Sequence, residues 1–188
     1  QQVEASLRGG ATMIQLREKH MDRGSILAQA LELRELCGRY GVPLILNDDA
    51  ELAQAAGADG VHVGQSDMEA GRVRALLGED KLIGVSARTV EQALAAQAAG
   101  ADYLGVGAMF PTGTKQDTRP VSYDTLKAIC AAVDIPVVAI GGIGAGNVAE
   151  LAGSGIAGVA VVSALYAQPD VEAATRSLRA QVERVVGP

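Results

Sequence analysis

The sequence predicts an α/β fold of the (β/α)8 TIM barrel class, in a single domain that spans residues 1–188. Two observations predict it: short apolar runs recur between segments with helical periodicity, and glycine-containing joints precede several of these runs. Strands that alternate with helices favour a parallel sheet with right-handed connections, and no Rossmann glycine fingerprint is present. The chain offers seven apolar runs, so we expect seven readable strands and the first strand of the barrel to be lacking.

The seven runs are the predicted strands. They do not alternate cleanly between apolar and polar residues, which indicates strands buried on both faces, as in a parallel sheet. They cover residues 13–17, 43–48, 60–64, 82–86, 103–107, 136–142 and 158–164.

The segments between the runs have helical features. Residues 22–40 place leucine and isoleucine at helical spacings, residues 90–100 are rich in alanine, and residues 167–186 read as a closing helix. Glycine joints end the helical segments just before a strand, at residues 9–12, 57–59, 100–102 and 154–158. Glycine there fits the left-handed conformation that commonly ends a helix. The joint at residues 154–158 therefore predicts another helix before the last strand.

The composition excludes several classes of partner. The chain has 188 residues, a net charge of −6, 3% aromatic residues and no tryptophan. Nucleic acid is an improbable partner, because its backbone requires clustered basic residues and its bases require aromatic platforms. No apolar run has the length of a membrane span and no signal peptide is recognisable. Cys37 and Cys130 lie in helical segments without a CxxC motif, so we expect reduced, packed thiols in a cytoplasmic protein.

Three polar side chains follow one face of the first run. Gln15, Arg17 and Lys19 alternate in sequence, so they share one side of the strand and its extension. In a (β/α)8 barrel the active site gathers at the carboxyl ends of the strands. An inward Arg-x-Lys pair is costly there unless an anion binds it, and we favour an anion site over an exposed strand end.

The second and third runs contribute oxygen ligands. Asn47 and Asp48 end the second run, and Asp67 follows the third. Two carboxylates facing a cationic cluster predict Mg²⁺ bridging a polyphosphate. Asp67 is equally plausible as a helix N-cap, and Asp48 as an ordinary turn residue. His62 within the third run is more often a satisfied core histidine, and the sequence shows no zinc-ligand spacing.

The fourth and fifth runs lead into hydroxyl-bearing segments. Ser86 can donate to a phosphate or cap the helix that starts near Thr89. The loop MFPTGTKQD (109–117) is no Walker A motif, because Gly113 is followed by Thr114 before Lys115. Thr112, Thr114 and Lys115 suit a loop that covers a ligand, and equally a solvated loop.

The last two runs predict a second anion site of a different kind. Gly142 opens a glycine-rich turn, and Val162 and Ser163 begin a short helix, a pattern typical of the phosphate site of such barrels. One cationic and one backbone-built site predict two phosphorylated substrates. Mg²⁺ with Lys and Arg on a diphosphate stabilises a leaving group, and no nucleophile or acid–base pair is recognisable.

These motifs together resemble the thiamine phosphate synthase family. The matching segments are QLREK (15–19), ILND (45–48), ADGVHVGQSDM (58–68), IGVSART (83–89), GADYLGVGAMFPTGTKQD (100–117), PVVAIGGI (136–143) and GVAVVSAL (158–165). The resemblance implies a (β/α)8 barrel that joins hydroxymethylpyrimidine diphosphate to a thiazole phosphate. The products are thiamine phosphate and pyrophosphate, formed by ionisation to a pyrimidine cation that the thiazole nitrogen captures.

The resemblance also implies residue roles. Arg17, Lys19, Asn47, Ser86 and Lys115 would hold the diphosphate, and Arg17, Lys19, Ser86 and Lys115 would be catalytic. Asp48 and Asp67 would bind Mg²⁺, Gln15 and His62 would touch the pyrimidine, and Thr112, Thr114, Gly142, Val162 and Ser163 would hold the thiazole phosphate.

Two departures and three alternatives accompany this interpretation. The family usually begins with a further strand, and it often has His where this chain has Arg88. A thiazole tautomerase paralogue would not need the Mg²⁺–diphosphate residues, and a non-catalytic sensor would bind a phosphorylated ligand without turnover. A sugar-phosphate isomerase would need an acid–base pair. The sequence does not set the oligomeric state.

Overall fold

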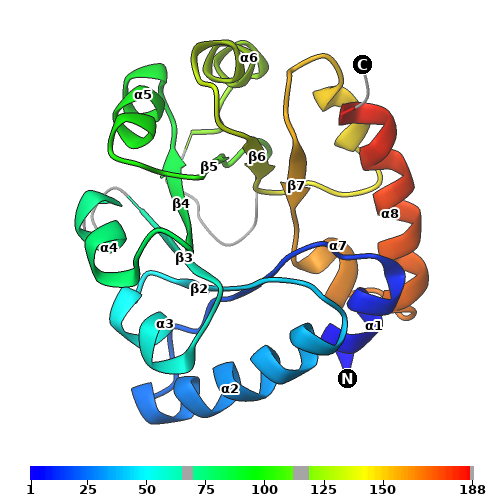
Figure 1. Ribbon diagram of the computed structural model, residues 1–188. Helices are drawn as coiled ribbons and strands as arrows, with labels where there is room; N and C mark the ends of the chain where they lie inside the picture. The colour runs from blue at the N-terminus through cyan, green and yellow to red at the C-terminus, as the bar shows by residue number, and fades with distance from the viewer. Residues whose placement is uncertain (65–69, 112–118, 187–188) are drawn as a thin grey trace.

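A computed structural model describes residues 1–64, 70–111 and 119–186. Its single sheet contains seven parallel strands in the order β1-β2-β3-β4-β5-β6-β7, which confirms the predicted strands and the barrel class. The strands are β1 (Ile14–Leu16), β2 (Leu44–Asn47), β3 (Gly60–Val63), β4 (Leu82–Ala87), β5 (Tyr103–Val106), β6 (Val137–Ile140) and β7 (Gly158–Ala160). In Figure 1 they curl about a common axis inside a ring of helices. Strands β1 and β7 are the two ends of this order, so the described sheet is an open barrel.

The helices form the outer layer (Figure 1). They are α1 (Gln2–Gly9), α2 (Arg23–Arg39), α3 (Ala50–Ala56), α4 (Ala70–Leu77), α5 (Val90–Ala98), α6 (Tyr123–Ala132), α7 (Ser163–Tyr166) and α8 (Val171–Val186), with a 3₁₀ helix η1 at Val148–Leu151. Helix α1 packs against α8, and Gly9 permits the close approach. A Cβ atom at Gly9 would lie 2.5 Å from the carbonyl oxygen of Glu172.

The segment before β7 differs from the expected helical unit. Only the one-turn 3₁₀ helix η1 lies between β6 and β7. A glycine-rich turn follows β6 first, and its Gly141 and Gly142 have positive φ angles, which are not those of a right-handed helix. The joint itself behaves as predicted, since Gly155 is also left-handed, with φ of 96°.

Two of the predicted joints share the sequence Gly-Ala-Asp, and the structure explains why. Gly57 and Gly100 are left-handed, with φ of 65° and 100°. The aspartate that follows each turns back to the neighbouring strand: Asp59 Oδ2 accepts from Leu44 N, and Asp102 Oδ2 accepts from Ile83 N, both at 2.8 Å. Each joint therefore ends a helix and fixes the start of the adjacent strand.

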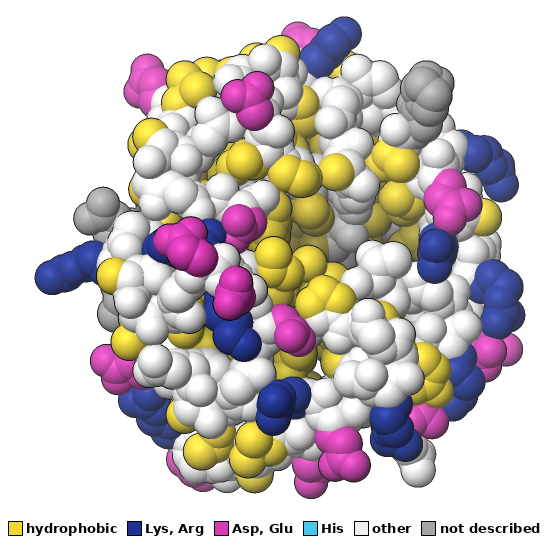
Figure 2. Space-filling model, in the orientation of Figure 1, with side chains coloured by type: hydrophobic (Ala, Val, Ile, Leu, Met, Phe, Trp, Pro, Cys, Tyr) yellow, Lys and Arg dark blue, Asp and Glu magenta, His cyan; other side chains and the backbone are white. Residues whose placement is uncertain are grey.

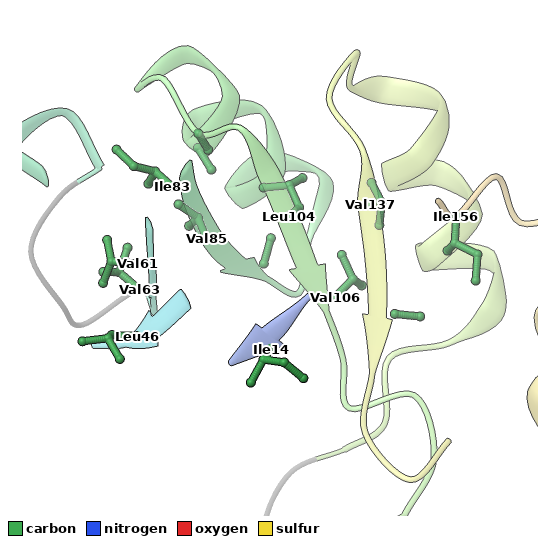
Figure 3. Packing of buried hydrophobic residues seen from close by; sticks show 14 of the residues in the cluster. Ile14, Leu46, Val61, Val63, Ile83, Val85, Leu104, Val106, Val137 and Ile156 are labelled. Carbon is green, nitrogen blue, oxygen red and sulfur yellow. The ribbon is translucent and has the colours of Figure 1, made fainter. Parts of the chain in front are cut away.

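The strand register separates two faces of the sheet. One face packs under the helices and forms the core, with Leu46, Val61, Ile83, Leu104 and Val137 among its buried members (Figure 3). The alternate positions face the barrel axis. The pairs Asn47↔His62, His62↔Gly84 and Gly84↔Tyr103 place polar and glycine residues together on that inner face. The candidate site is built there.

Among the residues that the structure describes, no helix is both long and apolar enough to cross a bilayer.

Candidate active site

A row of polar side chains lines the inner face of β1 to β5. It starts with Gln15, whose neighbours Ile14 and Leu16 are buried under the helices, so that the amide must face inward. Gln15 Nε2 donates to Asn47 Oδ1 at 2.8 Å, which joins the ends of β1 and β2. Gln15 and Asn47, which the resemblance assigns to the pyrimidine and to the diphosphate, are therefore in direct contact.

The row continues with His62 on β3. Its Nε2 lies 2.8 Å from Ser86 Oγ on β4, and its Nδ1 lies 3.1 Å from the hydroxyl of Tyr103 on β5. Both ring nitrogens are therefore paired, as the satisfied-histidine alternative predicts. One of the two partners, however, is Ser86, which was predicted to donate to a phosphate. His62 therefore lies among the residues of the candidate site.

Two glycines make this arrangement possible. A Cβ atom at Gly84 would lie 2.1 Å from Tyr103 Cζ and 2.6 Å from His62 Nδ1, and one at Gly105 would lie 2.9 Å from His62 Cε1. Either methyl group would displace a ring. Burial raises the pKa of Tyr103 to about 12, because the phenolate would lose its hydration inside the barrel.

Ser86 does not cap the following helix. Helix α5 is capped by Thr89, whose side chain accepts from Gln92 N. The alternative role weighed for Ser86 is therefore wrong, and its hydroxyl is committed to the barrel interior beside His62.

Asp48 occupies an unusual backbone position at the end of β2. Its φ is 72°, and its amide donates to the carbonyl oxygen of His62 at 2.8 Å. A non-glycine residue in the left-handed region is uncommon, and such conformations cluster at functional sites. The next residue, Asp49, caps α3 through Leu52 N and pairs with Arg23, so the neighbouring carboxylates have separate roles.

The cationic residues lie at the same ends of the strands. Arg17 directly follows β1, level with Asn47 in the register set by Leu16↔Leu46, and both Arg17 and Lys19 are exposed. Within the described ranges neither of the two basic side chains forms an ion pair. They are available for an anion from solution.

Several predicted site residues fall outside the described ranges. They are Asp67, Thr112, Thr114 and Lys115. Among the residues that the structure describes, no three His, Cys, Asp or Glu side chains are grouped as metal ligands. The predicted Mg²⁺ pair of Asp48 and Asp67 stays a prediction.

The glycine-rich turn after β6 has a defined scaffold. Asn147 accepts from Gly144 N at 2.9 Å and donates to the carbonyl oxygen of Gly142 at 2.8 Å, which closes the turn. Phe110 N donates to the carbonyl oxygen of Gly141, so the loop after β5 is attached to this turn. A Cβ atom at Gly144 would lie 3.6 Å from Ala164 Cβ, so α7 is adjacent as well.

The end of β7 presents the remaining predicted residues. Val162 is 72% exposed, Ser163 is exposed and begins α7, and Gly142 is exposed on the adjoining turn. The structure thus brings the two predicted phosphate loops together. Figure 2 shows the opposite end of the barrel, at which the strands begin; its middle is hollowed and lined largely by hydrophobic side chains, with charged ones around it.

Arg88 has a structural partner at the base of the loop after β5. Its guanidinium donates to the carbonyl oxygen of Gly107 at 2.7 Å and to that of Arg119. It therefore joins the two limbs of the chain on either side of residues 112–118. The sequence left the role of this position open.

Two contributors were missed from the sequence. In the sequence, Tyr103 looked like an ordinary strand residue. A tyrosine in a glycine-containing strand, two strands along the sheet from a histidine, was nevertheless a usable signal. Asn147 lies in the glycine-rich turn and was not among the predicted site residues. Both act through side-chain hydrogen bonds across elements, which spacing alone does not reveal.

Comparison with known proteins supports this picture. The family model described as thiamine monophosphate synthase matches residues 1–165. The chain is 49% identical over 176 residues to the thiamine-phosphate synthase of Ruminiclostridium cellulolyticum, covering 94% of this chain and 84% of that protein. It is 52% identical over 181 residues to the thiamine-phosphate synthase of Chloroflexus aurantiacus, covering 96% and 83%.

A solved structure gives the same result. The thiamine phosphate pyrophosphorylase from Pyrococcus furiosus superposes with a TM-score of 0.91 at 39% sequence identity, covering 99% of this chain and 90% of that one. A 3-hexulose-6-phosphate synthase shares the fold, with a TM-score of 0.69 at 21% identity.

Proposed function

Because the chain belongs to the thiamine monophosphate synthase family, we propose that it couples hydroxymethylpyrimidine diphosphate with hydroxyethylthiazole phosphate, releasing pyrophosphate. The observation that carries the proposal is the inner row from Gln15 to Ser86, which ends beside Arg17 and Lys19. It supplies amide, hydroxyl and cationic groups at one side of the barrel, while the glycine turn closed by Asn147 lies at the other.

The cationic side is proposed to bind the diphosphate. Arg17 offers a planar fork of donors and Lys19 a point charge, and both suit phosphate oxygens. The Asn47 amide and the Ser86 hydroxyl add neutral donors. Lys115 is assigned to the same group, so that negative charge developing on the leaving diphosphate is met by fixed positive charge and donors.

The pyrimidine is proposed to lie against Gln15 and His62. Both present nitrogen-bearing groups on the inner face, where alternate positions are glycine and leave space for a ring. The thiazole phosphate is assigned to Gly142, Val162 and Ser163 with Thr112 and Thr114. In this arrangement the protein orients the thiazole nitrogen toward the pyrimidine methylene carbon. The C–O bond to diphosphate breaks first, and the thiazole nitrogen then forms the C–N bond with the resulting pyrimidine cation.

The donor set fits Mg²⁺. Asp48 is an exposed carboxylate held in a left-handed turn next to Asn47, and carboxylate oxygens with retained waters are the usual environment of this ion. Asp48 and Asp67 would hold it. Bound there, Mg²⁺ would supply charge that neutralises the departing diphosphate.

The proposed partners are these small molecules, and neither nucleic acid nor a membrane is among them. We infer a cytoplasmic location from the thiols of Cys37 and Cys130, which are free and whose pKa values are raised by burial.

The test of the proposal distinguishes substrate coupling from the two alternatives, which are tautomerisation of the thiazole phosphate and ligand binding without turnover. The purified chain receives both substrates with Mg²⁺, then the thiazole phosphate alone. Thiamine phosphate formed only from the pair supports a synthase. Interconversion of thiazole tautomers without coupling would indicate the tautomerase alternative, and binding without any product would indicate a sensor.

A further inference from the structure

The side chain of Asn147 is committed to the glycine-rich turn after β6, which comprises residues 141–147. Asn147 directly precedes η1, where asparagine commonly caps a helix, yet its side chain caps none of the described residues of η1. Instead, Nδ2 donates to the carbonyl oxygen of Gly142 at 2.8 Å, and Oδ1 accepts from Gly144 N at 2.9 Å. The amide therefore connects two peptide groups within the turn.

The two contacts define one orientation of this amide. With Nδ2 and Oδ1 exchanged, a donor would face the Gly144 N–H and an acceptor would face the Gly142 carbonyl oxygen, and both hydrogen bonds would be lost. The backbone beneath the side chain is fixed as well. Asn147 N and Val148 N both donate to the carbonyl oxygen of Gly144, and Val148 is buried in the core.

The peptide planes on both sides of Gly142 are held through their carbonyl oxygens. That of Gly141 accepts from Phe110 N at 3.1 Å, and that of Gly142 accepts from Asn147. In a trans peptide the N–H points opposite to the carbonyl, so the first bond directs the Gly142 N–H away from Phe110. Among the described residues, no group accepts from this N–H, and Gly142 is exposed. Such a backbone amide in a turn is suited to an anion.

Glycine needs this external restraint. Gly142 is left-handed, with φ of 66°, and without a Cβ atom it has access to many other conformations. The bond from Phe110 holds the peptide plane before Gly142, and the bond from Asn147 holds the plane after it. Loss of either bond allows Gly142 to rotate and its N–H to change direction.

From these contacts we propose that Asn147 is a positioning residue that holds the peptide plane after Gly142, so that the Gly142 N–H keeps its direction toward the phosphate of the acceptor substrate. Asn147 acts through Gly142 and not by contact with the phosphate. The inference rests on the proposed function in one respect, namely that the ligand of Gly142 is the thiazole phosphate.

Steady-state kinetics with each substrate varied in turn separate positioning from a general loss of structure. In Asn147→Ala we expect the KM for the thiazole phosphate to rise about tenfold, as for the loss of one hydrogen bond. The KM for the pyrimidine diphosphate and kcat should stay within about twofold, because Asn47 and Ser86, which are assigned to the diphosphate, lie on β2 and β4. A merely structural role would affect both substrates alike.

Asn147→Asp is the second variant. Its carboxylate can still accept from Gly144 N but cannot donate to the carbonyl oxygen of Gly142, so the KM for the thiazole phosphate should again rise at least about tenfold. Since this variant also adds a negative charge, the control is Glu150→Gln, which changes the charge by one unit at an exposed position of η1. It should leave all three parameters within about twofold.

Two kinetic outcomes would overturn the proposal. One is a KM for the thiazole phosphate that stays at the parent value in either Asn147 variant. The other is an equal rise of both KM values in Asn147→Ala.

Amide hydrogen exchange and ligand titration report on the turn without turnover. The Gly144 N–H should exchange faster in Asn147→Ala than in the parent chain and keep the parent rate in Asn147→Asp. The thiazole phosphate alone should shift the Gly142 amide resonance of the parent chain, and higher concentrations should be needed in either variant. If this resonance shifts but no thiamine phosphate forms with both substrates, the proposed function fails and the inference stands. An unshifted Gly142 resonance, or unchanged Gly144 exchange in Asn147→Ala, would overturn the inference even if coupling occurs.

Discussion

Individual charges at the strand ends are the most direct determinants of the proposed chemistry. Lys19 is exposed and forms no ion pair within the described ranges, so its charge is not needed by the fold. Lys19→Ala should lower kcat/KM for coupling about 10²- to 10³-fold, the usual effect of removing one donor to developing charge. Asp67→Ala should act similarly, and circular dichroism should show intact folds.

The matched control is Lys127→Ala, which removes an exposed lysine from α6. Its rate of pyrophosphate release should equal that of the parent chain. Undiminished release by Lys19→Ala or Asp67→Ala would contradict the assigned roles.

The two adjacent aspartates after β2 allow the metal assignment to be separated from backbone effects. Asparagine tolerates the left-handed region, so Asp48→Asn keeps the backbone and removes the charge. We expect the Mg²⁺ concentration for half-maximal activity to rise at least about tenfold. Asp49→Asn retains the helix cap and should leave the Mg²⁺ dependence unchanged, so equal dependence in both variants would refute a metal role for Asp48.

The raised pKa of Tyr103 has a consequence for alkaline stability. Between pH 10 and about 12 the unfolded chain loses this proton while the folded chain keeps it, so the unfolded state binds fewer protons. The free energy of unfolding therefore falls as pH rises through this window. The fall should be smaller in Tyr103→Phe than in Tyr123→Phe, measured by urea unfolding at several pH values. An equal fall in both would contradict the burial of this phenol.

At the scale of helices and strands, the Gly-Ala-Asp joints show which structural features the sequence predicts and which it does not. Their glycines predicted the helix ends correctly, and the seven apolar runs predicted the strands. The function of the aspartate was not predictable, because it bonds to a strand 15 or 19 residues earlier in the chain. The joint before β7 predicted a helix there, but not that it is a one-turn 3₁₀ helix, since helical spacing in so short a segment is not distinctive.

Asp102 is the better test of these joints, because it also pairs with Arg74, whose side chain is only 14% exposed. Asp102→Ala leaves Ile83 N and the guanidinium without this acceptor, and should lower the free energy of unfolding by about 2 kcal/mol. Urea unfolding measures it, and we expect a single transition because one core spans the strands. Asp80→Ala, at an exposed loop position, should change it by less than about 0.5 kcal/mol. A loss no larger than this in Asp102→Ala would contradict the role of the joint.

At the scale of the whole molecule, the fold was predictable because strand alternation and glycine joints repeat along the chain. The site was predictable only in part. The inner positions of Gln15, Asn47, His62 and Ser86 follow from alternation once the sheet is assumed, but the pairing of His62 with Tyr103 depends on Gly84 between them. That relation exists only across three strands of a curled sheet, and no local pattern contains it.

The central claim is that, at the carboxyl ends of the strands, one side of the barrel ionises a diphosphate while the other side holds the phosphorylated acceptor. The most direct measurement follows pyrophosphate and thiamine phosphate in the same reaction, with Mg²⁺ and with the metal removed by chelation. We expect the two products in equal amounts with Mg²⁺, and loss of both on chelation with recovery when Mg²⁺ is restored. Turnover that is independent of the metal, or pyrophosphate released without thiamine phosphate, would contradict it.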